Sequence, residues 1–238
     1  MTWSILARDG NGRFGVVIAS RFFAVGALCV HTRRGLGALS TQALMNPLYG
    51  PAGLAMLGEG HAPAEAVAAL TAADAGRAQR QLHVLGARGP GAAYTGEACI
   101  EWCGHRLYDD FSVAGNMLAG PQVLQATADA FVASAGRPLA ERLIEALAGG
   151  EAAGGDKRGK QSAALRIHGD EDHAELDIRV DDHAEPVAEM RRLYAVSLQR
   201  FQPFVACLPG RHDPVGELDR ARIEARIEAF HAARAGNR

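Results

Sequence analysis

The chain begins Met1-Thr2, and this threonine becomes the first residue once the methionine is removed. Its hydroxyl then lies next to its own α-amine, whose ordinary pKa of about 7.7 to 8.0 suits a base at neutral pH. Such a hydroxyl–amine pair is a known means of activating a weak alcohol nucleophile. A small second residue also permits removal of Met1 in proteins that make no use of the new terminus. The groups around Thr2 therefore decide whether it is a candidate nucleophile.

The spacing of the first two predicted strands brings Arg21 toward Thr2. A DGNG run at residues 9–12 separates these strands and is a strong hairpin signal. A two-residue loop at Asn11-Gly12 places Thr2 opposite Arg21, and a loop one residue earlier leaves Arg21 on the diagonal of the same face. A bulged three-residue loop would reverse this parity. We predict that Arg21 lies beside Thr2, where its charge lowers the amine pKa. The alternative is a cation at a strand end that is either paired or solvated.

Further polar residues are predicted to surround this pair. Ser4 shares the face of Thr2. Asn116 ends a strand that leads into a helix, where its amide could hold an oxyanion; a turn asparagine with a satisfied backbone contact is the alternative. Residues after the early strands and in a glycine-rich loop are predicted to line a substrate pocket: Gln42, Asn46, Tyr49, Asp156, Arg158 and Gln161.

Two other sequence patterns, a near phosphate-binding loop and a candidate metal site, fit their motifs poorly. The run from Gly154 to Lys160 is nearly a phosphate loop, but Gln161 follows it and it leads from a helix into a strand, the reverse of the required order. Asp181, Asp182 and His183 offer a metal-dependent hydrolase as a weaker hypothesis, since no ligand spacing typical of a first-row metal is evident. We predict neither a metal nor a cofactor.

The arrangement of elements predicts an α+β fold. Strands are expected over residues 2–8, 13–20, 24–32, 36–42, 81–87, 92–95, 111–116, 162–168 and 175–180. Helices are expected over residues 51–57, 62–73, 121–134, 138–149, 186–199 and 215–233. The wholly apolar run from Phe14 to Ala19 indicates a strand covered on both faces. This order favours a four-layer αββα sandwich over a doubly wound parallel sheet, because hairpin-like neighbours replace single-helix crossovers.

Composition limits the partners and the location of the chain. The 238 residues carry a formal net charge of -2, which gives no general field for nucleic acid or an anionic membrane. We find no signal peptide, no membrane-spanning stretch and no cysteine framework, and expect a cytoplasmic protein. Residues 1–200 are predicted to form the main domain. Residues 201–238 form an extension whose amphipathic helix carries, on one side, Leu218, Ile223, Ile227 and Phe230.

Several motifs also resemble a known family. They include TWSILARD, GVVIASRFFAVGA, TQALMNPLYGPAGLAML, VAGNMLAG and LDIRVDDHAEPVAEMRRL, in order between residues 2 and 197. These runs are similar to the bacterial family called domain of unknown function 1028. The resemblance implies a fold of the N-terminal-nucleophile hydrolase type, whose members cleave amide bonds and often mature by autoproteolysis. It implies Thr2 as the nucleophile and Arg21, where many relatives have lysine, as its basic neighbour; it implies no substrate.

Two functional hypotheses follow. The first is an amidohydrolase that cleaves a small amide or peptide-like C–N bond through Thr2. The second is a non-catalytic binding or assembly protein that has kept the fold. In either case we expect a homo-oligomer with no nucleic-acid or membrane partner.

Overall fold

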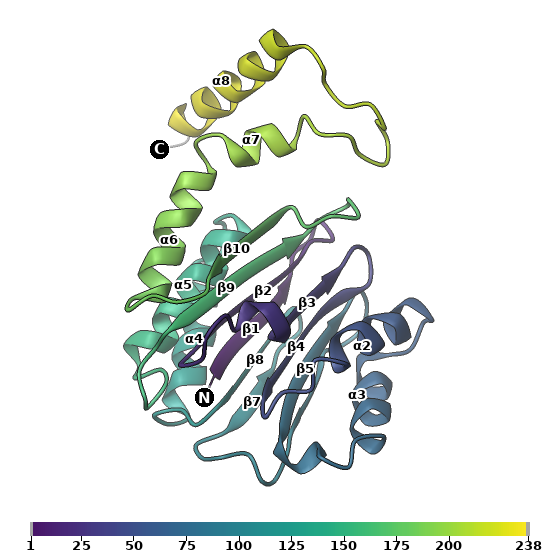
Figure 1. Cartoon of the computed structure of the whole chain (residues 1–238), viewed down its shortest axis with the longest axis vertical. Helices are drawn as coiled ribbons and strands as arrows, with labels where there is room; N and C mark the ends of the chain where they lie inside the picture. Colours follow the sequence, from purple (N-terminus) through teal and green to yellow (C-terminus); the bar gives the residue numbers. More distant parts are fainter. Residues whose placement is uncertain (1, 237–238) are drawn as a thin grey trace.

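The computed structural model describes residues 2–236, which form two antiparallel sheets and eight α-helices (Figure 1). The six-stranded sheet has the order β10-β9-β2-β1-β8-β7. Its strands are β1 (Thr2–Arg8), β2 (Phe14–Ser20), β7 (Gly104–Leu107), β8 (Phe111–Asn116), β9 (Ser162–His168) and β10 (Leu176–Val180). The four-stranded sheet has the order β3-β4-β5-β6. Its strands are β3 (Val30–Arg33), β4 (Gly37–Ala43), β5 (Arg80–Gly86) and β6 (Ala92–Thr95).

Helices cover the outer faces of both sheets. The longer ones are α2 (Tyr49–Gly58), α3 (Pro63–Ala72), α4 (Gln122–Ala133), α5 (Leu139–Ala152), α6 (Pro186–Ser197) and α8 (Arg220–Gly236). The short ones are α1 (Gly26–Cys29) and α7 (Phe201–Val205), and Arg77–Gln79 form a 3-10 turn. Helices α2 and α3 pack beside the four-stranded sheet, and α4 and α5 lie on the other side of the molecule (Figure 1).

The alternation of side chains along β1 explains how the two faces of its sheet are used. Trp3 and Ile5 point outward into a core shared with α4, α5 and α6. Leu6 points inward and packs with Leu85 of the facing sheet. All seven residues of β2 are buried, which confirms the prediction that this strand is covered on both faces. Even-numbered residues of β1 therefore face the space between the sheets.

Some elements differ from the sequence prediction. The expected strand over residues 24–32 is a strand only over its last three residues, because Gly26–Cys29 form α1 and β3 begins at Val30. Strand β7 was not predicted, and the C-terminal extension contains α7 in addition to the one helix expected there. The last helix begins at Arg220, and Ile227 is its buried residue. In the described part of the chain, no helix combines the length and apolar character needed to cross a membrane.

Helix α5 does not end at Gly149-Gly150 as predicted, but continues to Ala152. These two glycines permit close packing instead of ending the helix. A Cβ atom on Gly149 would lie 2.7 Å from Cβ of Ala130, and one on Gly150 would lie 2.3 Å from Oγ1 of Thr127. The glycines thus let α5 approach α4 closely, and a β-carbon at either position would force the helices apart.

We expect Gly150→Ala to destabilise the protein by about 1 to 3 kcal/mol through overpacking, although alanine is the better helix former. The new methyl group would meet Thr127 and would also lie 2.8 Å from the indole nitrogen of Trp3. Urea denaturation measures the effect. Gly58→Ala is the matched control, because its methyl group would meet only the flexible end of Leu36, at 3.2 Å. A Gly150→Ala variant as stable as the parent chain would contradict this account of the packing.

Candidate functional site

Four polar side chains form one row across the six-stranded sheet. Thr2 pairs with Ser20 on one side and with Asn116 on the other, and Ser20 pairs in turn with Ser162. Directly opposed residues point to the same face, with Cβ atoms about 4.5 to 5.5 Å apart. Thr2 and Leu6 are both even-numbered residues of β1, so their side chains point to the same face of the sheet. Because Leu6 faces the second sheet, the row faces it as well. Thr2 is 6% exposed, and the other three are nearly or wholly buried.

The hydroxyl of Thr2 is hydrogen-bonded to the hydroxyl of Ser20, with 3.1 Å between their oxygen atoms. Both predicted hairpin registers are therefore wrong. The backbone N–H of Asp9 donates to Arg13 O at 3.0 Å, so three residues, 10–12, form the loop, with Gly12 at a positive φ of 78°. The carboxylate of Asp9 accepts the N–H groups of Asn11 and Arg13, which stabilises this longer turn. An odd loop length shifts the register by one residue and gives Ser20 the place predicted for Arg21.

Arg21 follows the last residue of β2 and is exposed. Its guanidinium donates to Lys160 O at 3.1 Å, and its backbone N–H donates to the carboxylate of Asp156 at 3.1 Å. Among the described residues, no hydrogen bond joins Arg21 to Thr2. Arg21, the basic residue predicted beside Thr2, is thus displaced to the rim of the site.

The predicted loop residues do lie at this end of the sheet. The buried carboxylate of Asp156 accepts the N–H groups of Arg21 and Arg158, the latter at 2.7 Å. The backbone N–H of Gln161 donates to Ser20 O at 2.9 Å, and its side chain donates to Asp182 at 3.0 Å. The loop is therefore fixed directly beside the row that contains Thr2.

Asn116 is held by a glutamine that the sequence pattern did not reveal. Its Nδ2 donates to Oε1 of Gln81 at 3.1 Å, and Nε2 of Gln42 donates to the same oxygen at 2.7 Å. The amide nitrogen of Gln81 in turn donates to Thr95 Oγ1, Gly104 O and Gly115 O at 2.8, 3.0 and 2.9 Å. Gln81 is wholly buried and links strands of both sheets. It therefore sets the orientation of the Asn116 amide, the predicted oxyanion donor.

The same network passes through Ser4 to a buried histidine. Ser4 donates its only hydroxyl proton to Oε1 of Gln42 at 2.7 Å, so it accepts from Nε2 of His83, 2.9 Å away. Nδ1 of His83 must then accept from the hydroxyl of Ser112, also at 2.9 Å. Burial, with a smaller contribution from the charge of His105, lowers the pKa of His83 to about 3. His83 is neutral at physiological pH, with its proton on Nε2.

The buried imidazole predicts a pH dependence of stability. Between pH 6.5 and 3 the unfolded chain protonates His83 and the folded chain does not, so stability falls as the pH falls through this window. The loss attributable to this group is roughly 3 kcal/mol at pH 4. Urea denaturation from pH 7 to pH 4 measures it, with His83→Gln as the comparison. The variant is expected to lose less stability over this range; equal pH slopes would contradict the assignment.

Asn46 and Tyr49, which were predicted to line the pocket, lie elsewhere. Asn46 Nδ2 and the Tyr49 hydroxyl both donate to Oδ2 of Asp74, at 3.1 and 2.8 Å, and Arg80 forms an ion pair with the same carboxylate at 3.1 Å. The hydrogen bond from Tyr49 is the main cause that lowers the pKa of Asp74. Tyr49 packs with Leu39 on the outer face of the four-stranded sheet. The sheet thus separates both residues from Thr2.

Backbone strain gathers around the row. Within residues 2–236, three residues other than glycine have positive φ: Ala24 (50°), Ala43 (66°) and Met117 (53°). Ala43 directly follows Gln42, and Met117 directly follows Asn116. Such conformations cost of order 1 kcal/mol or more and are frequent where side chains must be aimed for function. Ala43 and Met117 therefore mark the strand ends that carry the Gln42 and Asn116 amides.

Metal binding finds no support in the described residues, where no group of three potential ligands occurs. Asp181, one of the alternative metal ligands, forms an ion pair with Arg179 at 2.8 Å, and Asp182 accepts from Gln161. Both carboxylates are therefore engaged by neighbouring side chains of the chain.

Comparisons with known proteins place the chain in a family. A model described as "Family of unknown function (DUF1028)" matches residues 2–190, as the motifs indicated. The crystal structure of SPO2555 from Silicibacter pomeroyi, also a DUF1028 protein, is 30% identical with a TM-score of 0.85, over 92% of this chain and 96% of that one. Anbu (ancestral beta-subunit) from Yersinia bercovieri aligns over 87% of this chain and 98% of its own at 14% identity and a TM-score of 0.42, too distant a likeness to carry an argument. No curated protein matches the sequence. The chain belongs to the DUF1028 family, whose function is unknown.

Proposed function

We propose that this protein is an amidohydrolase that cleaves a small amide or peptide-like C–N bond with Thr2 as its N-terminal nucleophile. The observation that carries the proposal is the position of the Thr2 hydroxyl. It lies at the start of a central strand, bonded to Ser20 and directly opposite Asn116, whose amide is fixed by Gln81. A nucleophile needs a neighbour that orients it and a donor for the developing oxyanion, and these residues supply both.

The proposed reaction requires Met1, which lies outside the described residues, to be removed. The α-amine of Thr2 takes the hydroxyl proton while Oγ1 attacks the carbonyl carbon. The Asn116 amide donates to the oxyanion of the tetrahedral intermediate. The intermediate collapses as the ammonium group returns the proton to the leaving nitrogen, and the C–N bond breaks. Water then hydrolyses the acyl ester, and Thr2 is regenerated.

Arg21 has a different role in this proposal from the one expected. Its exposed guanidinium has a backbone carbonyl as a partner and, among the described residues, no carboxylate. It lies next to Ser20 in the chain, at the rim of the site. We assign it to the binding of a substrate carboxylate, a group that guanidinium recognises well.

The fold proposed with this function is the four-layer αββα sandwich of the N-terminal-nucleophile hydrolases. Three apolar clusters support it. One joins the six-stranded sheet to α4, α5 and α6, one lies between the two sheets, and one joins the four-stranded sheet to α2 and α3. This is the layering that such a sandwich requires.

The proposal is tested by intact-mass spectrometry of the chain purified from its native host. We expect a mass without Met1 and a single covalent adduct after treatment with a hydroxyl-directed electrophile such as a β-lactone, mapped to Thr2. A screen of small amides and N-acyl amino acids then identifies the substrate class. A chain that keeps Met1 in its host would reject the proposal.

The alternative is a binding or assembly protein, and the C-terminal segment favours it. Beyond α6 the chain leaves large apolar side chains in solvent, with Leu218 77% and Phe201 49% exposed. Helices α7 and α8 extend beyond the ends of the sheets (Figure 1). Exposed apolar groups of this size are typical of protein contacts. Light scattering of the intact chain shows whether a second copy covers them, and the mass of the N-terminus decides between the two functions.

A further inference from the structure

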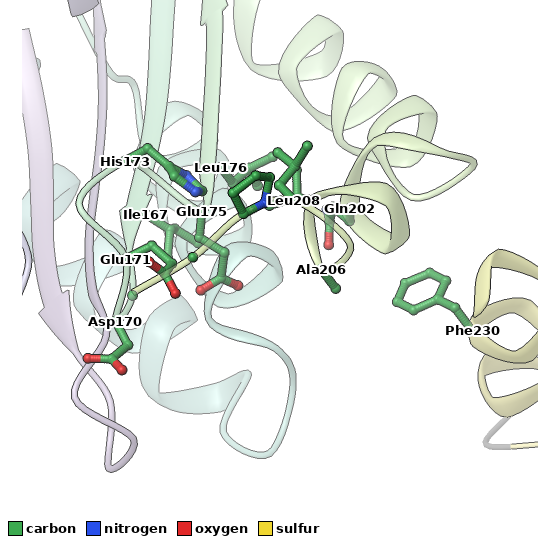
Figure 2. Close-up of a pocket in the computed structure, with 14 residues that line it drawn as sticks. Ile167, Asp170, Glu171, His173, Glu175, Leu176, Gln202, Ala206, Leu208 and Phe230 are labelled. Carbon is green, nitrogen blue, oxygen red and sulfur yellow. The ribbon is translucent and has the colours of Figure 1, made fainter. Parts of the chain in front are cut away.

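A cavity of about 380 Å³ lies between the turn that joins β9 to β10 and the C-terminal segment. Residues of the turn form one wall, and residues of α7, the loop after it and Phe230 of α8 form the other (Figure 2). The volume falls in the range of small-molecule sites, about 300 to 1,000 Å³.

Most side chains that line the cavity are either apolar or acidic, and His173 and Gln202 are the other polar ones. The apolar residues that line it are Ile167, Leu176, Val205, Ala206, Leu208, Pro209 and Phe230. Three carboxylates lie on the turn side, from Asp170, Glu171 and Glu175. Neither lysine nor arginine is found among the described residues that line it. Such a lining suits a ligand with a positive group at one end and an apolar body at the other.

The negative charge of the turn is only partly compensated. Asp170 pairs with Arg34 at 3.0 Å and faces His212 at 3.6 Å. Glu171 accepts the backbone N–H of Arg211 at 2.9 Å and, among the described residues, forms no ion pair. Glu175 is 3.4 Å from a guanidinium nitrogen of Arg13, which has a closer carboxylate partner at 2.7 Å. Glu171 and Glu175 therefore leave the cavity with excess negative charge.

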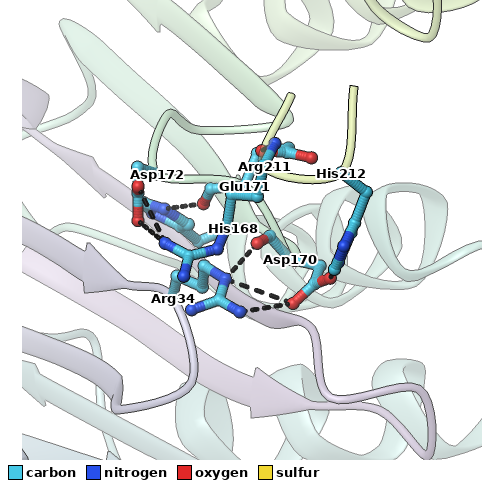
Figure 3. A network of polar contacts seen from close by, with 7 residues as sticks. All are labelled: Arg34, His168, Asp170, Glu171, Asp172, Arg211 and His212. Carbon is cyan, nitrogen blue, oxygen red and sulfur yellow. Dashed lines mark hydrogen bonds and ion pairs between the residues drawn. The ribbon is translucent and has the colours of Figure 1, made fainter. Parts of the chain in front are cut away.

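A polar network joins the two walls of the cavity, the turn between β9 and β10 and the loop after α7 (Figure 3). Arg211 forms an ion pair with Asp172 at 3.0 Å, and His168 is hydrogen-bonded to Glu171 O at 2.9 Å. Gly210 packs so closely that a Cβ there would lie 2.5 Å from Oε1 of Glu171. These contacts join the C-terminal loop to the turn, so the cavity is a built feature of the fold.

The cavity is distinct from the row that contains Thr2. Along β9, Ser162 pairs with Ser20 at the end of that row, whereas His168 pairs with Phe14 at the opposite end of β2. Seven residues of extended strand separate these ends by roughly 20 Å. Binding in the cavity and chemistry at Thr2 are therefore separable by experiment.

We propose that this cavity binds a small organic cation, a protonated amine with an apolar body. The ammonium group donates to the carboxylates of Glu171 and Glu175, and the body packs against Leu208 and Phe230. Charge-assisted hydrogen bonds of this kind are the stronger class in proteins. A bare metal ion is a poorer match, because no group of three potential ligands occurs in the described residues and much of the lining is apolar.

Isothermal titration calorimetry of the full chain tests this with three probes of one shape: phenethylammonium, 2-phenylethanol and phenylacetate. We expect saturable binding of the ammonium ion, at least about tenfold weaker binding of the alcohol, and none of the carboxylate. Glu175→Gln and Phe230→Ala should each weaken ammonium binding by about tenfold or more. Glu228→Gln is the matched control, since it removes an exposed acid two residues from Phe230, outside the cavity.

Three results would overturn the proposal: no ammonium binding at millimolar concentration, equal binding of the alcohol, or equal effects of Glu175→Gln and Glu228→Gln. Glu171→Gln replaces Glu175→Gln if that variant fails to fold. Thr2→Ala should bind the ammonium ion like the parent chain, whatever its effect on amide cleavage. Loss of binding in Thr2→Ala would show that the cavity is not an independent site.

Discussion

Thr2→Ala is expected to abolish covalent labelling by the electrophile and to reduce amide turnover by at least about a thousandfold, the scale of loss when a catalytic nucleophile is removed. The variant loses the attacking oxygen but keeps the α-amine. The fold should be nearly unchanged, because the substitution removes one hydrogen bond, to Ser20, worth about 1 kcal/mol. Mass spectrometry, kinetics with the amide from the screen, and urea denaturation measure these effects.

Two further variants give this prediction its controls. Thr2→Ser keeps a hydroxyl on the first residue and should keep labelling and part of the activity. Ser20→Ala leaves the nucleophile in place but removes the hydroxyl bonded to it, and is expected to slow labelling without abolishing it. Full amide turnover by Thr2→Ala would exclude Thr2 as the nucleophile.

The α+β class and most of the strands and helices could be predicted, because they depend on local patterns. Alternation in β1 and the apolar run of β2 each reflect which faces are covered, and strands such as β6, β8 and β9 have the predicted bounds. The sequence signals for the ends of helices were less reliable. Gly149 and Gly150 were interpreted as the end of α5. They instead allow α5 to pack closely against α4, a tertiary contact that a local pattern cannot reveal.

The neighbour of Thr2 could not be predicted, because it depends on the length of one loop. Both two-residue loops fit the DGNG run, yet the Asp9 carboxylate stabilises a turn with one more residue. A change of one residue in the loop places Ser20, rather than Arg21, beside Thr2. Asp9 was the available signal, since aspartate at the start of a turn often accepts N–H groups from the residues that follow.

The polar network behind the site was missed for a different reason. Gln81 and His83 alternate with Leu82 and Val84, a pattern that ordinarily indicates a strand with one face in solvent. In this fold the polar face of β5 instead meets the other sheet. Gln81 and His83 find partners on β1 and β8 of that sheet and on β4 of their own sheet. Only the packing of the two sheets shows that these side chains are wholly buried.

Gln81→Leu is therefore expected to have the largest effect on stability, a loss of about 4 kcal/mol or more. Leucine fills the space but accepts no hydrogen bond, so the amide groups of Gln42 and Asn116 lose the oxygen to which both donate. The carbonyl groups of Gly104 and Gly115 lose their donor as well. Each buried polar group left without a partner costs about 1 to 3 kcal/mol. Urea denaturation of the full chain measures the total loss in free energy of unfolding.

The same substitution links the network to the site. Without Gln81 the Asn116 amide is free to turn, so labelling of Thr2 should slow even in the fraction of Gln81→Leu that stays folded. Gln79→Leu, an exposed position two residues earlier, is the control and should change stability by no more than about 0.5 kcal/mol. If Gln81→Leu cost as little as Gln79→Leu, the network would not hold the sheets together. If Thr2 were labelled at the parental rate in the folded fraction of Gln81→Leu, the Asn116 amide would not depend on Gln81 for its orientation.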